Sequence, residues 1–297
     1  MQFFFEVLIG GLLAGIMYSL VALGFVLIYK ASGVLNFAQG AMVFFAALTT
    51  VGFTEKGMPL AVAAAVTFGV MIVLGILIER VVLRPLVNQP QITLFMATIG
   101  LAFFIEGLAQ GFWGSGVRAL DIGIEDAPIE WISEKSGMNI SKFDLAASGI
   151  CAVLVAVLAL FFNRTRIGRA LRAVADDHQA ALAVGIPLQQ IWAIVWSVAG
   201  FVALVAGLLW GARNGVQFAL TFVALKALPV LILGGFESVA GAIVGGLIIG
   251  AAEKLAEVYL GPFVGGGIEG WIAYVIALLF LLVRPEGLFG EKHIDRV

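Results

Sequence analysis

The chain has 297 residues, of which 62% are hydrophobic and only 12% are charged, with a mean hydropathy of +1.09 and a formal net charge of −2. A soluble globular domain carries about 25% charged residues, so this composition excludes an ordinary water-soluble protein. The single cysteine, Cys151, excludes a disulfide within one chain and a cysteine-based metal site.

Charge-free runs recur along the chain, and each is close to the roughly 20 residues that cross a hydrocarbon core. One such run fits a buried helix in a large soluble protein, but the five runs Val7–Tyr29, Ala31–Thr54, Gly57–Ile78, Pro85–Ile105 and Leu145–Asn163 do not. We therefore predict an all-α polytopic membrane protein forming a single transmembrane domain, 1–297. The spans expected in chain order are 5–29, 36–54, 59–79, 91–113, 144–163, 189–212, 222–235, 238–258 and 266–283.

The distribution of arginine and lysine predicts the orientation, because short cytoplasmic loops are rich in both. The connection 164–172 holds four arginines, and the connection 79–84 holds two, so both are expected in the cytoplasm. The acidic connection 114–143 suits the opposite side. With nine crossings the N-terminus is periplasmic and the C-terminus cytoplasmic. If 222–235, which contains Pro229, were re-entrant, the count would be eight.

Motifs for catalysis are missing from the sequence. It has no G-x-x-x-x-G-K-[ST] loop for nucleotide phosphates, no H-E-x-x-H and no G-x-S-x-G. His178 lies in the basic connection and His293 in the tail, outside the spans where an intramembrane enzyme needs a base. We predict that the chain is not an enzyme.

Polar side chains inside apolar spans are costly and are therefore candidates for function. Glu106 and Gln110, one helical turn apart, give the fourth span a polar face, and Lys226 opens the seventh. Glu253 and Glu257 share a face of the eighth span. The alternative is that the last two mark the membrane interface and that Glu106 pairs with a neighbouring helix.

Asn36 and Gln39 stand between two glycines and two apolar stretches, in the run SGVLNFAQG (32–40). Transporters build solute contacts at membrane depth from broken helices with exposed backbone and amide groups. We therefore place both amides among the candidates for the solute pathway. The alternative is a tight turn followed by a capped helix.

The cytoplasmic segment 164–187 has apolar residues at roughly helical spacing with charges between them, which predicts a short amphipathic helix pair. Gly185 is a suitable helix stop, with Pro187 two residues later. Such a segment either lies on lipid or fills a groove in a partner protein.

Glycine pairs spaced four apart, Gly11–Gly15, Gly241–Gly245 and Gly246–Gly250, predict close approach between helices in the membrane.

Four blocks of the sequence, in order, resemble LivH-type permeases of branched-chain amino acid ABC transporters. The stretch GIMYSLVALGFVLIYKASGVLNFAQGAM (15–42) is similar to the N-terminal signature of that family, and GRALRAVADDHQAALAVGI (168–186) to its cytoplasmic coupling loop. KALPVLILGGFESVAGAIVGGLIIGAAE (226–253) resembles its glycine-rich signature and RPEGLFG (284–290) its characteristic end. Leu228–Pro229 departs from the small residues expected in the third block.

The resemblance implies a multi-pass subunit of a heteromeric importer in the bacterial inner membrane. The implied partners are a periplasmic solute-binding protein, a LivM-type second permease and two cytoplasmic ATPases, with no nucleic acid. ATP would be hydrolysed by the ATPases, so no cofactor is expected in this chain. The coupling residues implied for the ATPase interface are Arg169, Arg172, Asp176, Asp177 and Gly185. The alternative function is a stand-alone secondary transporter or channel for small polar solutes.

Overall fold

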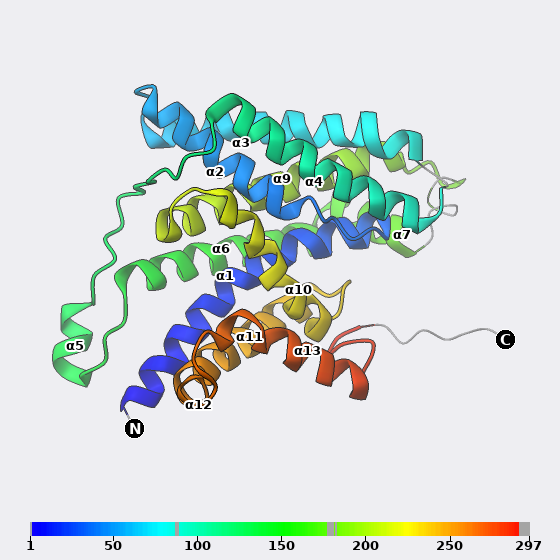
Figure 1. The fold of residues 1–297 in the computed structure, drawn as a ribbon. Helices are drawn as coiled ribbons and strands as arrows, with labels where there is room; N and C mark the ends of the chain where they lie inside the picture. The colour runs from blue at the N-terminus through cyan, green and yellow to red at the C-terminus, as the bar shows by residue number, and fades with distance from the viewer. Residues whose placement is uncertain (1, 87–88, 177–180, 182, 291–297) are drawn as a thin grey trace. The chain divides into compact units, whose positions relative to one another are not determined.

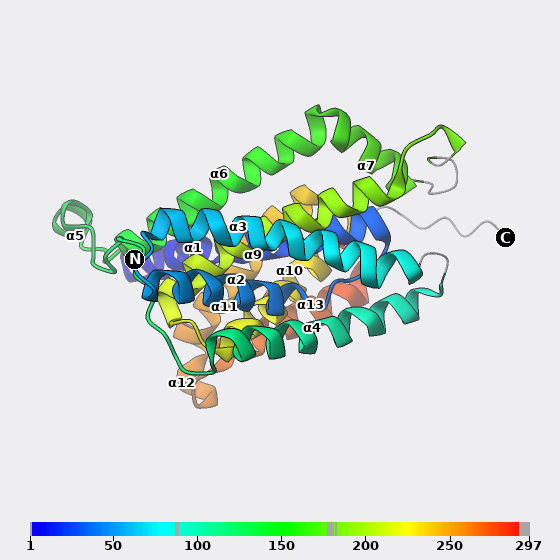
Figure 2. The ribbon, with the colours of Figure 1, turned by 90° about the horizontal axis from the view of Figure 1, so that it is seen from above.

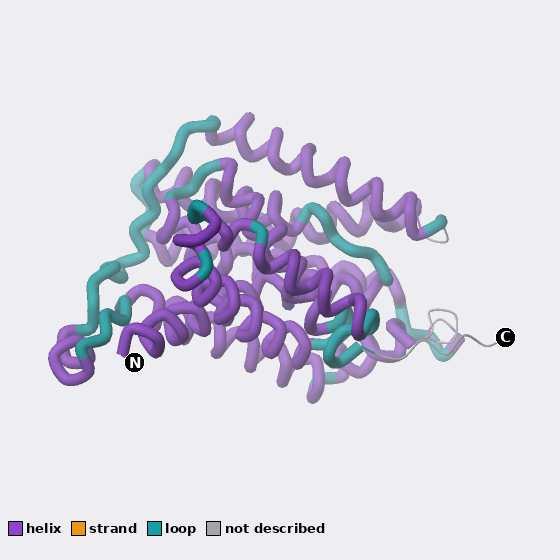
Figure 3. Tube along the Cα trace, turned by 60° about the horizontal axis from the view of Figure 1, so that its bottom comes forward, coloured by secondary structure: helices purple, strands orange, loops and turns teal. Residues whose placement is uncertain are grey.

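The computed structural model describes residues 2–86, 89–176, 181 and 183–290, and within these residues the chain is helical and forms no β-strand (Figures 1 and 3). Its long helices are α1 (Gln2–Ser32), α2 (Gln39–Glu55), α3 (Leu60–Leu77), α4 (Gln91–Trp113), α6 (Lys142–Arg164), α9 (Leu188–Asn214) and α11 (Val239–Tyr259). The shorter ones are α5 (Glu130–Ser136), α7 (Arg166–Asp176), α10 (Val223–Gly234), α12 (Gly261–Val264) and α13 (Ile272–Val283). A π-helical turn, Ile78–Leu83, prolongs α3.

Each predicted span coincides with a helix, which confirms the all-helical membrane class. Within the described residues, six helices are long and apolar enough to cross a membrane: α1, α3 with its extension to Leu86, α4, α6, α9 and α11. The remaining predicted spans correspond to shorter helices, since α2 has 17 residues and α10 and α13 have 12 each. The acidic connection between α4 and α6 is mostly loop and contains the short helix α5 (Figure 3).

Two of the predicted spans start three or more residues before the corresponding helices. α2 begins at Gln39 rather than at residue 36, because the Asn36 side chain accepts the backbone N–H of Ala38 and holds a local turn instead of a helix. α13 begins at Ile272 rather than at residue 266, because Gly265, Gly266 and Gly267 all adopt positive φ angles that a helix excludes.

The helices form two compact units. The first unit comprises Met1–Leu23, Gly123–Val155 and Leu225–Val297, and the second comprises Gly24–Ile122 and Ala156–Ala224. α1, α6 and α10 each contribute one part to either unit.

In the second unit, α2 is the central helix. Its residues from Gln39 to Gly52 are all buried, and it packs against α3, α4 and α9, which run beside it in Figures 1 and 2. Glycines allow the close approach of the neighbours. A Cβ added at Gly207 would lie 2.6 Å from the Val43 carbonyl oxygen, and one at Gly75 would lie 2.9 Å from the Ser197 backbone nitrogen. These contacts join α9 to α2 and to α3.

In the first unit, glycines bring α1 against α11 and α11 against α10. A Cβ at Gly11 would lie 2.7 Å from the Gly250 carbonyl oxygen, and one at Gly245 would lie 2.6 Å from the Val230 carbonyl oxygen. Gly15 and Gly246 make the same kind of backbone contact one turn along. The predicted packing role of the glycine pairs is confirmed.

Replacing Gly250 by valine is expected to lower the unfolding temperature of the purified chain in detergent. The new side chain would collide with the backbone of Gly11 and Gly15, and overpacking of this kind costs about 1–3 kcal/mol. Gly100→Val in α4 is the matched control, because no atom lies within 4 Å of the Cβ that it would add. Equal unfolding temperatures for the two variants, measured by tryptophan fluorescence, would show that the α1–α11 contact is not needed.

Candidate functional site

The break between α1 and α2 in the second unit holds the first candidate site. Gly33, with φ of 67°, ends α1 and donates its N–H to the Tyr29 carbonyl at 2.7 Å. Residues 34–36 then run without helical structure, and a turn at residues 37–38 leads into α2. Thr98 of α4 holds this stretch, since its hydroxyl donates to the Leu35 carbonyl at 3.2 Å and accepts the Phe37 N–H at 3.3 Å. The hydrogen bonds with Thr98 of α4 therefore stabilise the helix break.

Asn36 and Gln39 meet in this break, as the sequence predicted for a broken helix. Both side chains are fully buried, at 0% exposure. Asn36 Oδ1 accepts the Ala38 N–H at 3.1 Å, and Asn36 Nδ2 donates to Gln39 Oε1 at 3.3 Å. Asn36 thus stabilises a tight turn, which was the alternative interpretation, and also contacts the Gln39 amide.

The Gln39 amide has a hydrogen-bond donor that the described residues leave unused. Its Nε2 is buried and finds no hydrogen-bond partner among the described residues. It packs on Gly24, where any Cβ would collide with it, and Gly40 allows equally close contact with the Thr221 carbonyl. A buried amide nitrogen without an acceptor costs about 1–3 kcal/mol. An acceptor on a solute reaching this position would recover that free energy.

A buried ion pair in the first unit forms the second candidate site. Lys226 Nζ lies 2.7 Å from Glu253 Oε1, and the Tyr18 hydroxyl lies 3.5 Å from both atoms. The Glu253 side chain is 4% exposed, whereas that of Lys226 is 34% exposed. The three residues come from α1, α10 and α11. The Glu253 carboxylate is enclosed, and the Lys226 side chain is the more exposed member of the pair.

Glu253 was assigned to the membrane interface as an alternative in the sequence analysis, and the ion pair with Lys226 was missed. The signal was present, because an acid and a base in two apolar spans are each expensive alone and stable together. Glu257, one turn later, instead accepts the backbone N–H groups of Gly267 and Glu269 at 2.9 Å each. Glu257 therefore holds the turn that follows α12.

Glu106 and Gln110 lie on one side of α4, both half-buried. They form a polar stripe beside the buried residues Ile105 and Ala109. Within the described part of the chain the structure shows no hydrogen bond from either side chain to Asn36 or Gln39. Among the described residues, no hydrogen bond therefore connects the Glu106–Gln110 pair to the Asn36–Gln39 pair.

The predicted coupling segment begins with a sharp corner. α6 ends at Arg164 and α7 starts at Arg166, and at Gly168 a Cβ would collide with the Phe162 carbonyl. α7 is amphipathic as predicted, with Leu171 and Val174 buried.

Both predicted coupling arginines are exposed, and each also holds the corner. Arg169 donates to the Arg164 carbonyl at 3.4 Å, and Arg172 donates to the Asn163 carbonyl at 3.3 Å. They therefore satisfy carbonyls that the end of α6 leaves free.

The far end of the coupling segment is partly described. Asp176 is the last residue of α7, while Asp177 and His178 lie outside the described residues. Gly185 adopts a φ of 82°, and the Ile186 N–H donates to the Ala181 carbonyl at 2.9 Å. This bond pattern ends a helix at a left-handed glycine, so the predicted stop at Gly185 is confirmed. Among the described residues no group of three His, Cys, Asp or Glu side chains could hold a metal ion.

Comparison with known proteins finds one family over nearly the whole chain. Residues 7–284 match the family described as branched-chain amino acid transport system / permease component. The chain is 28% identical over 309 residues to the high-affinity branched-chain amino acid transport system permease protein LivH of Salmonella typhimurium, covering 99% of this chain and 98% of that protein. It is 29% identical over 306 residues to the corresponding protein BraD of Pseudomonas aeruginosa, with the same coverage. A more distant relative is the fructose import permease protein FruG of Bifidobacterium longum, 23% identical over 263 residues, which cover 84% of this chain and 74% of that protein.

Removing one partner of the buried ion pair is expected to destabilise the protein strongly. Lys226→Met should cost about 3 kcal/mol, because it leaves the enclosed Glu253 carboxylate without its cation. Lys226→Met combined with Glu253→Met should cost less than the sum of the single changes. Urea or thermal unfolding in detergent measures the three values.

The pair Lys254–Glu269 provides the control for this cycle. Its atoms lie 3.3 Å apart, but its side chains are 40% and 42% exposed. Lys254→Met should therefore cost about 0–1 kcal/mol. Similar costs for Lys226→Met and Lys254→Met would contradict the structural role of the buried pair.

Proposed function

This chain belongs to the family of branched-chain amino acid transport system permease components, and from that premise we propose that it conducts branched-chain amino acids or related small polar solutes inward across the inner membrane. It is the permease subunit of an ABC importer. The observation that carries the proposal is the family match over residues 7–284. Relatives of this family are transport permeases and not enzymes, and the free energy for transport would come from ATP hydrolysed by partner subunits.

We propose nine crossings, with the N-terminus in the periplasm and the C-terminus in the cytoplasm. The proposal takes the six long spans together with α2, α10 and α13. It is supported by the arginines at the α6–α7 corner, which favour the cytoplasmic side. An odd number of crossings then brings the end of α13, with Arg284, to the same side.

The partners follow from the family. An ABC permease works with cytoplasmic ATPases and a solute-binding protein, and we propose a LivM-type second permease in addition. α7 is the proposed contact for an ATPase, through its exposed Arg169 and Arg172. Because the same arginines hold the end of α6, a movement of α7 would be passed directly to a membrane span.

The solute pathway is proposed to include Asn36 and Gln39, with Glu106, Gln110 and Lys226 as further polar positions. The buried amides support this role because a zwitterionic amino acid offers both donors and acceptors to them. In the conformation described here they are closed off by Gly24 and by α4. Alternating access, in which helices rearrange around a fixed site, would expose them in turn to the two sides.

The identity of the solute is proposed from the relatives. LivH and BraD are named for branched-chain amino acids and FruG for fructose, so the scaffold serves more than one solute class. Branched-chain amino acids are preferred because LivH and BraD, which match over 99% of this chain, carry that name. Much of the selectivity would lie in the separate binding protein.

Gentle extraction of the tagged chain from native membranes should recover a second permease and two ATPases, identified by mass spectrometry. A variant with Arg169→Glu and Arg172→Glu should lose the ATPases and keep the second permease, because reversed charge at α7 removes the proposed contact. Arg169→Lys with Arg172→Lys is the matched control, since it keeps both charges. Recovery of the wild-type chain alone, under conditions that preserve other ABC complexes, would favour a stand-alone carrier.

Loss of either buried amide is expected to lower solute uptake by the reconstituted complex at least about tenfold, the equivalent of roughly 1.4 kcal/mol. Gln39→Met discriminates better than Asn36→Leu, because it removes only the bond between the two amides, whereas Asn36→Leu also removes the bond to the Ala38 N–H. Assembly of the complex should be normal for both variants. Gln190→Met, at an exposed amide of α9, is the control, and wild-type uptake by Gln39→Met would remove Gln39 from the pathway.

A further inference from the structure

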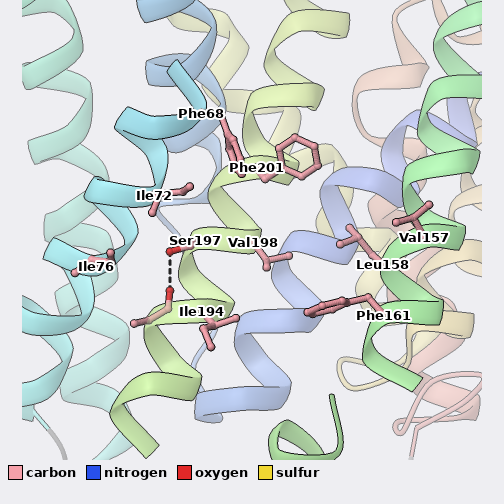
Figure 4. Close-up of a pocket in the computed structure, with 11 residues that line it drawn as sticks. Phe68, Ile72, Ile76, Val157, Leu158, Phe161, Ile194, Ser197, Val198 and Phe201 are labelled. Carbon is pink, nitrogen blue, oxygen red and sulfur yellow. Dashed lines mark hydrogen bonds between the residues drawn. The ribbon is translucent and has the colours of Figure 1, made fainter. Parts of the chain in front are cut away.

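An apolar groove lies between α3, α6 and α9 in the second unit (Figure 4). Its volume is about 450 Å³. Three hydrophobic side chains come from α3 and three from α6, and the other lining residues come from α9. The lining residues are Phe68, Ile72, Ile76, Val157, Leu158, Phe161, Ala193, Ile194, Ser197, Val198 and Phe201.

The groove offers almost nothing to a polar ligand. Ser197 is the one residue of its lining with a polar side chain, and its hydroxyl donates to the Ala193 carbonyl at 2.8 Å within α9 (Figure 4). Phe68 and Phe201 meet edge to face at 4.9 Å at one end. The groove is therefore suited to hydrocarbon and is separate from the polar positions of the solute pathway.

The length and lining of the groove suit an acyl chain. Phe68 and Ile76 are eight residues apart, which is about 12 Å along a helix axis. An extended hydrocarbon chain can lie along a groove of that length and contact hydrophobic side chains of α3, α6 and α9 throughout.

Arginines lie at one end of the groove. α3 and α9 run antiparallel, because Gly75 contacts Ser197 and Gly200 contacts Met71. Ile76, Ile194 and Phe161 thus mark the same end, the lower one in Figure 4.

Just beyond that end, Arg80 follows Ile76 by four residues, and Arg164 follows Phe161 by three. Both arginines are exposed, and the acidic Glu79 nearby is buried and bonded to Arg84 at 3.2 Å. This end of the groove therefore presents positive charge.

We propose that the groove binds one acyl chain of an anionic phospholipid, with the phosphate of its headgroup held by Arg80 and Arg164. Basic pockets between membrane helices bind anionic headgroups, and guanidinium groups match phosphate oxygens in geometry. The lipid would fill the space between α6 and the α3–α9 pair. It would thereby brace the helix that leads into the α6–α7 corner.

The test compares lipid retained by the assembled transporter in nanodiscs of phosphatidylglycerol and phosphatidylethanolamine. Native mass spectrometry should find phosphatidylglycerol retained on the wild-type protein. Arg80→Gln with Arg164→Gln should weaken that preference about fivefold per arginine removed, the factor that corresponds to the usual contribution of one arginine near an anionic surface. Ile194→Trp should displace the lipid, and Ala193→Leu is the milder variant if the first fails to fold.

Controls and a second measurement separate this site from general contact with lipid. Val73→Trp places the same bulk on the exposed face of α3 away from the groove, and Lys56→Gln neutralises a charge beyond the end of α2. Both should leave retention unchanged. Phosphatidylglycerol with a photoreactive acyl chain should crosslink to the groove residues. Equal retention by the wild type and the groove-filling variants, or crosslinks of the photoreactive lipid only to residues outside the groove, would overturn the proposal.

Discussion

At membrane depth there is no water to satisfy a polar group, so each donor and acceptor in the spans needs a partner within the protein. This constraint accounts for the two polar sites described here. Glu253 is enclosed because Lys226 and Tyr18 accompany it, and the break between α1 and α2 is stable because Asn36 and Thr98 bond to its backbone. The Gln39 Nε2 is the exception within the described residues of this break, and this unused donor is the basis for our proposal that a transported group binds there.

The same apolar solvent removes the hydrophobic effect as a force between helices, so close packing takes its place. Glycine supplies it in both units. In the first, Gly11 meets Gly250, and in the second, Gly207 meets Val43. Helix backbones in direct contact form rigid groups, and rigid groups that move as bodies are what alternating access requires.

The proposed function rests on position rather than on reactive chemistry. The amides, the ion pair and the arginines of α7 would bind and hold, and the free energy would come from ATP hydrolysis in partner subunits. Arg169 and Arg172 combine two features, because they are exposed, as the proposed ATPase contact requires, and also bond to the last carbonyls of α6. The proposed lipid groove lies along that same helix.

The sequence by itself determined the membrane class, the approximate spans, the family resemblance and the packing role of the glycine pairs, because these depend on local composition and spacing. It also located Asn36, Gln39 and the Gly185 stop, because the contact of Asn36 with Gln39 and the bond pattern at Gly185 join residues a few positions apart. Only the tertiary structure decided that Lys226 pairs with Glu253, 27 residues later, and that Glu257 holds a turn. It also decided where α13 begins and where a groove separates α6 from α9. Such features depend on which faces of distant helices meet, and a linear pattern of apolar residues leaves that choice open.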